Sequence, residues 1–154
     1  APGARRPSAA LRELDTPPGR VVYEVPADTL DGIAHVLIGP PGVFAVRTSM
    51  EPLPALSNEP ADPKAVGEAA IARGGVDDAL RRCGMSSDRL VVAHWGVNDG
   101  NELALDPLPG VTAVDGRRIG EWVDGLDDCE LAESQVDLAW QTILTTIGRP
   151  DPLA

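Results

Sequence analysis

The residues that could carry chemistry surround two apolar runs that meet at a Pro/Gly turn, between positions 33 and 49. Three carboxylates lie close to these runs in the sequence: Glu24 and Asp31 precede them, and Glu51 follows. Carboxylate oxygens are the ligands that a hard cation such as Mg²⁺ prefers, and a bound cation can activate water for phosphodiester cleavage. A metal site built from these acids is therefore one hypothesis. The alternative, which we favour, is that the three acids are solvated loop and edge residues.

The two apolar runs predict a central β-hairpin. Both runs, Ile33–Ile38 and Val43–Val46, are short and bounded by turn residues, as is typical of buried strands. Within the turn, Pro41 presets φ to about −65°, and Gly42 can take the positive φ that a type II turn requires. The first run is apolar on both faces, which indicates that helices or loops cover it on both sides.

This hairpin resembles the core hairpin of the nuclease-related domain (NERD) family, in the restriction-endonuclease-like PD-(D/E)xK group. The family pattern reads as an Asp-His pair, an apolar strand, Gly-Pro-x-Gly, and then Val-Phe-x-x-Glu-x-Lys. His35, the turn at 39–42 and Val43-Phe44 match that pattern. The resemblance covers roughly residues 20–126, and it implies a restriction-endonuclease-like core.

The positions that carry the family's chemistry differ in this chain. Ala34 stands where the resemblance places the metal-binding Asp, Arg47 where it places the Glu, and Ser49 where it places the Lys. Alternate residues share a strand face, so positions 47 and 49 present together, and position 34 can meet them from the neighbouring strand. A methyl group, a guanidinium and a hydroxyl are poor Mg²⁺ ligands, so we expect no catalytic residue, metal or cofactor there. We expect Arg47 to pair with a nearby carboxylate or carbonyl.

The histidines and cysteines favour structural roles. His35 is expected to point to the face opposite Ala34 as a packed, hydrogen-bonded side chain, and His94 is expected to be structural at a strand end. Cys83 and Cys129 are too few for a disulfide scaffold, and the chain has no Cys-x-x-Cys pair, so we expect buried free thiols and no metal site.

Turn residues and periodicity predict the elements around the hairpin. These are a helix over 8–15, a strand over 20–25, a Pro-rich loop over 50–61, a helix from Asp62-Pro63 to Gly84, strands over 89–95, 102–105 and 110–114, a turn holding Asp99, Asn101 and Asp106, a short helix capped by Asp115, and a helix that follows a capping box at 127–130 and ends near 147. Gly74-Gly75 favours a break in the long helix. Trp122 and Trp140 fall on apolar helical stripes and are predicted to be core residues.

Together these elements predict an α/β fold with a restriction-endonuclease-like mixed central sheet flanked by helices, plus an additional C-terminal helix. A chain of 154 residues fits one domain, which we place at 8–148 between flexible tails at 1–7 and 149–154.

The charge balance bears on partners. The net charge is −11, with 13 basic against 24 acidic residues, and such a balance repels a polyanion, so nucleic-acid binding is not expected. No apolar run is long enough to span a bilayer, and no signal-like run follows the N-terminal arginines, so a cytoplasmic location is expected.

The prediction that follows is a catalytically inactive NERD-like domain that acts as a protein-binding or structural subunit. One alternative is a divergent metal-dependent nuclease with relocated carboxylates. A second alternative is a module that binds a small anion or nucleotide at the arginine-bearing face.

Overall fold

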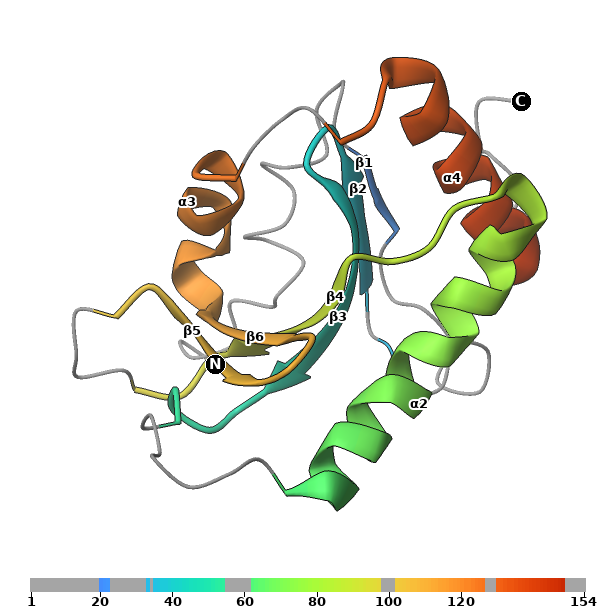
Figure 1. Ribbon diagram of the computed structural model, residues 1–154. Helices are drawn as coiled ribbons and strands as arrows, with labels where there is room; N and C mark the ends of the chain where they lie inside the picture. Colours follow the sequence, from blue (N-terminus) through green and yellow to red (C-terminus); the bar gives the residue numbers. More distant parts are fainter. Residues whose placement is uncertain are drawn as a thin grey trace.

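A six-stranded mixed sheet forms the centre of the molecule, with helices on both of its faces (Figure 1). The computed structural model describes residues 20–22, 33, 35–54, 62–97, 102–126 and 130–148. The strands are β1 (Arg20–Val22), β2 (His35–Gly39), β3 (Gly42–Ser49), β4 (Arg89–His94), β5 (Ala104–Leu108) and β6 (Val111–Asp115). The helices are α2 (Pro63–Leu80), α3 (Ile119–Asp124) and α4 (Glu133–Thr146), with the 3₁₀ turns η2 (Arg81–Cys83) and η3 (Gly116–Arg118). The predicted α/β class and mixed sheet are confirmed.

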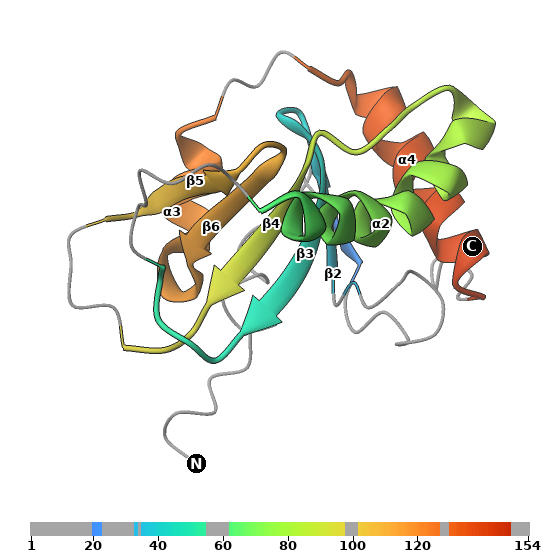
Figure 2. The same cartoon turned by 60° about the horizontal axis from the view of Figure 1, so that its bottom comes forward.

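The sheet combines an antiparallel meander with parallel strands. Its order is β1-β2-β3-β4-β6-β5. The β1, β2 and β3 strands pair antiparallel, α2 then connects β3 to the parallel strand β4, and β6 pairs parallel with β4. The β5 strand closes the far edge antiparallel to β6. Figure 2 shows β3, β4 and β6 running side by side, with α2 lying across one face.

The predicted hairpin is present, with a different turn centre. Gly39 pairs with Gly42, so the two loop residues are Pro40 and Pro41, and Gly42 begins β3 instead of lying inside the turn. Gly42 has the predicted positive φ, at 135°. A Cβ atom there would lie 2.0 Å from Oδ2 of Asp88, so the position requires glycine for space as well as for backbone conformation.

Two apolar clusters cover the two faces of the sheet. Odd-numbered residues of β3, Val43 and Ala45, pack with α2 and α4. Even-numbered residues, Phe44 and Val46, pack with α3. Every residue of β2 is buried, which confirms the expectation that both faces of this strand are covered. The fold is therefore a three-layer arrangement, with α2 and α4 on one face and α3 on the other (Figure 1).

The long helix starts as predicted and does not break. The carboxylate of Asp62 accepts a hydrogen bond from Lys64 N at 3.0 Å, and Pro63 occupies the first turn. The helix continues through Gly74-Gly75 to Leu80, so the predicted break is wrong. Tertiary packing outweighs the weak helix propensity of the two glycines, because Ala72 and Val76 on either side are buried in the core. Gly84, at φ 72°, ends η2.

Two boundaries near the C-terminus differ from the predictions. The last helix begins at Glu133, because Gln135 Oε1 accepts a hydrogen bond from Ala132 N at 2.8 Å. The predicted capping box at 127–130 is therefore wrong at Glu130, whose amide donates to Pro40 O in the hairpin turn at 3.0 Å. The β5 strand runs to Leu108 through Pro107, so Asp106 lies in a strand and not in the predicted turn. Proline is tolerated there because β5 is an edge strand with an irregular register.

Several predictions fall outside the described residues. These are the tails at 1–7 and 149–154, the helix over 8–15, most of the Pro-rich loop (55–61), Asp99, Asn101, and Cys129. Within the described ranges, no helix combines the length and apolar character needed to cross a membrane.

Candidate functional site

The strand face that the family pattern assigns to catalysis lies at the C-terminal end of β3. Since Val43 and Ala45 face α2 and α4, strand alternation places Arg47 and Ser49 on that same face. The regular pairing of β3 through Ser49 is consistent with a shared face for positions 47 and 49, and the register partners of Arg47 and Ser49 in β4 are Val92 and His94.

The polar groups at this strand end hold the following loop. Ser49 Oγ accepts a hydrogen bond from Glu51 N at 3.1 Å, and Ser49 O accepts one from Trp95 N at 2.8 Å. Glu51 O accepts from Gly96 N at 3.1 Å and lies 3.3 Å from His94 Nδ1. A Cβ atom on Gly96 would lie 2.4 Å from the Glu51 backbone, so the loop and the end of β4 are in close contact. Ser49 and His94 therefore have structural partners here.

The structure describes only some of the other residues of the predicted site. Ala34, Glu24 and Asp31 lie outside the described residues, so the pairing of Arg47 with Glu24 or Asp31 stays a prediction. Arg47 is half-buried and has an interaction partner. The described ranges contain no group of three or more His, Cys, Asp or Glu side chains placed to hold a metal ion.

His35 and Cys83 take the structural positions that were predicted for them. His35 is only 5% exposed and lies opposite Val46 in the β2–β3 pair, on the face that α3 covers. Cys83 is a free thiol whose Sγ donates to Leu80 O at 3.2 Å, although the side chain is half-buried instead of fully buried.

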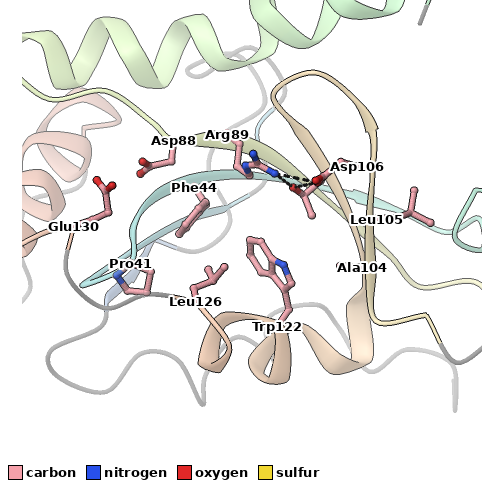
Figure 3. Close-up of a pocket in the computed structure, with 11 residues that line it drawn as sticks. Pro41, Phe44, Asp88, Arg89, Ala104, Leu105, Asp106, Trp122, Leu126 and Glu130 are labelled. Carbon is pink, nitrogen blue, oxygen red and sulfur yellow. Dashed lines mark hydrogen bonds and ion pairs between the residues drawn. The ribbon is translucent and has the colours of Figure 1, made fainter. Parts of the chain in front are cut away.

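A separate cavity of about 580 Å³ opens on the α3 face of the sheet, near the other end of β3 (Figure 3). Its apolar part is formed by Pro41, Phe44, Trp122 and Leu126. The rings of Phe44 and Trp122 meet edge to face, with centroids 5.5 Å apart and planes at 72°. This volume is within the range of small-ligand sites in proteins, roughly 300–1,000 Å³. We call this cavity the aromatic groove.

One end of the aromatic groove carries a closed polar network. Arg89 Nη1 donates to Asp106 Oδ1 at 3.0 Å and also to the Thr112 hydroxyl, which in turn donates to Asp106 Oδ1 at 2.7 Å. Thr112 is buried at 2% exposure, whereas the Asp106 side chain is 64% exposed. The charges of Arg89 and Asp106 therefore offset each other within the groove.

The other end of the groove carries two carboxylates, Asp88 and Glu130, which lie next to each other in Figure 3. Asp88 Oδ2 accepts a hydrogen bond from Val43 N at 2.8 Å, and Asp88 N donates to Val43 O at 2.7 Å. Both residues are exposed, and within the described part of the chain neither forms a salt bridge. Among the described residues that line the groove, three carboxylates stand against one guanidinium.

Sequence reasoning missed this groove. Its residues come from the hairpin turn, β3, the loop before β4, β4, β5, β6, α3 with the residue Leu126 after it, and the loop before α4, so no local spacing connects them. The i, i+3, i+4 pattern correctly assigned Trp122 to the inner face of its helix, but the side chain is half-buried and lines a cavity. Trp140 packs against the core on the other face, as predicted.

Comparison of the chain with protein-family models, with curated proteins and with solved structures returned no significant match. The resemblance to the NERD family therefore rests on the residues of the hairpin and on the order of the strands and helix around it.

Proposed function

We propose that this chain is a catalytically inactive NERD-like domain, with a restriction-endonuclease-like core, that acts as a protein-binding or structural subunit. The arrangement of its first strands supports the assignment. Three antiparallel strands are followed by a helix that leads into a parallel fourth strand, and the Gly-Pro-Pro-Gly turn joins the second and third strands. That is the order of elements that the family resemblance implies.

The main support for a loss of catalytic activity is the identity of two side chains at the end of β3. Arg47 and Ser49 occupy one face, at the positions where the family pattern has its Glu and Lys. Cleavage of a phosphodiester through Mg²⁺ needs carboxylate oxygens around the cation. A guanidinium at this place repels the cation, and the Ser49 hydroxyl already accepts the Glu51 amide.

The neighbouring acid Glu51 is placed as a loop residue. Its amide and carbonyl hold the chain against Ser49 and Gly96, and its side chain is exposed. This arrangement favours the inactive domain over a nuclease with relocated carboxylates, in which Glu51 would act together with Glu24 and Asp31.

The protein-binding role is supported by the aromatic groove and by the charge of the chain. A cavity with two aromatic rings and exposed carboxylates is suited to a partner side chain, and a net charge of −11 disfavours nucleic acid.

A cleavage assay tests the proposal. The purified chain, incubated with DNA or RNA and with Mg²⁺ or Mn²⁺, should produce no cleavage above a buffer control. Cleavage that is lost in Asp31→Ala or Glu51→Ala, but kept in Glu68→Ala on the exposed side of α2, would instead establish the relocated nuclease. Identification of proteins that co-purify with the native chain would then name the partner.

A further inference from the structure

A second, smaller hollow shares two lining carboxylates, those of Asp88 and Glu130, with the aromatic groove. This hollow, of about 180 Å³, is lined by Val43, Met85, Ser86 and Leu131 together with Asp88 and Glu130. Asp88 and Glu130 also line the aromatic groove. The two acids therefore stand between two partly apolar hollows.

The carboxylates of Asp88 and Glu130 favour a cationic ligand. Among the described residues that line the groove, Arg89 is the one basic residue, and it is already bonded to Asp106 and Thr112. Asp88 uses one oxygen for Val43 N and keeps Oδ1 for a further donor, and the Glu130 carboxylate makes no hydrogen bond to other described residues. A guanidinium or an ammonium placed there would give charge-assisted hydrogen bonds to both acids.

The two aromatic rings of the groove favour a second feature of the ligand. Trp122 is half-buried, and its ring meets that of Phe44 at the bottom of the groove. Such rings bind apolar side chains, and the face of Trp also attracts a cation. A ligand that combines a cationic group with an apolar neighbour therefore uses both parts of the groove.

We infer that this groove binds a segment of a partner protein in which an arginine or lysine side chain lies next to an apolar one. The cation sits between Asp88 and Glu130, and the apolar neighbour packs on Phe44 and Trp122. A peptide fits better than a small amine, because the acids have a hollow on each side and a chain can continue into both. This inference rests on the proposed protein-binding role and names the class of partner.

The two acids can be neutralised without disturbing the hairpin. In Asp88→Asn the side-chain oxygen can still accept the Val43 amide. Glu130→Gln changes a side chain that has no hydrogen bond to other described residues, so it should leave the fold intact even if the first change does not. The matched control is Asp78→Asn with Glu68→Gln, which makes the same two changes on exposed positions of α2.

The experiment uses a short capped peptide with one arginine followed by one leucine, and glycine and serine elsewhere. Its binding is followed by NMR shifts of the Trp122 indole and the backbone amides of residues 88 and 130. We expect binding to weaken at least about tenfold in the Asp88→Asn/Glu130→Gln variant and in Glu130→Gln to a smaller extent, and to stay within about twofold in the control variant. A peptide with citrulline in place of arginine should bind at least about tenfold more weakly.

The inference is overturned if the citrulline peptide binds equally well, if the control variant weakens binding equally, or if no shifts appear at Trp122. Duplex DNA that displaces the peptide from the groove would also overturn it. The outcome is separable from the proposed function, since peptide binding by a chain that cleaves DNA would refute the inactive domain alone. A chain that neither cleaves DNA nor binds the peptide would refute only the groove.

Discussion

The contact between Gly42 and Asp88 offers a quantitative test of how the hairpin is held. In Gly42→Ala the new methyl group would lie 2.0 Å from Asp88 Oδ2, on a backbone at φ 135°. The strained backbone conformation should lower the free energy of unfolding by about 1–3 kcal/mol. Displacing the Asp88 carboxylate from Val43 N costs about 1 kcal/mol more, since a hydrogen bond to an exposed charge lies at the low end of its range. We expect a total loss of about 2–4 kcal/mol, and a fall in Tm of about 5–15 °C.

A double-mutant cycle separates the two contributions. Once Asp88→Ala has removed the carboxylate, Gly42→Ala should cost only the backbone part, which leaves a coupling of about 1 kcal/mol. The unfolding free energy of the four proteins is measured by urea denaturation. Gly67→Ala on the exposed side of α2 is the control: nothing lies within 4 Å of its Cβ position, so it should stabilise by about 0.5–1 kcal/mol. A loss below about 0.5 kcal/mol in Gly42→Ala, or no coupling to Asp88, would refute the reasoning.

Three further substitutions test other contacts, each by urea denaturation. Asp77→Ala should lower the free energy of unfolding by about 2–4 kcal/mol, because both the amide and the hydroxyl of buried Ser87 donate to Asp77 Oδ1. The neighbouring substitution Asp78→Ala should lower it by less than about 1 kcal/mol, since Asp78 forms an exposed ion pair. Equal losses in the two variants would contradict this prediction. Gly96→Ala should lower the free energy of unfolding by about 2 kcal/mol or more, because its Cβ would lie 2.4 Å from the Glu51 backbone. An unchanged free energy of unfolding would show that the loop can move away. Thr112→Val should lower the free energy of unfolding by about 1–2 kcal/mol, because it removes the hydroxyl that bonds Asp106 and Arg89. An unchanged midpoint would show that this hydroxyl does not contribute to stability.

The parts of the fold that could be predicted from sequence are those with local causes. The hairpin follows from two apolar runs and a Pro/Gly turn, and the start of α2 follows from Asp62-Pro63. The unbroken course of α2 through Gly74-Gly75 could not be predicted, because burial on both sides of the glycines is a tertiary effect.

The two candidate sites also differ in whether local features of the sequence could predict them. The shared face of Arg47 and Ser49 follows from strand alternation, so it could be predicted. The aromatic groove could not, because Phe44, Asp88, Trp122 and Glu130 come from four separate segments. The sequence pattern predicts a helix cap at Glu130, whereas the amide of this residue is bonded to the hairpin turn.

Metal binding by a restored site tests the central claim most directly. In the proposed function, the frame of a NERD-like site is kept, whereas its metal-binding acids are lost at positions 34 and 47 and its lysine at position 49. The Ala34→Asp/Arg47→Glu/Ser49→Lys variant and the unchanged chain are titrated with Mn²⁺ by calorimetry, and thermal melting checks that the variant is folded. The account predicts saturable Mn²⁺ binding in the folded variant and none in the unchanged chain. Saturable binding by the unchanged chain, or none by a folded variant, would contradict it.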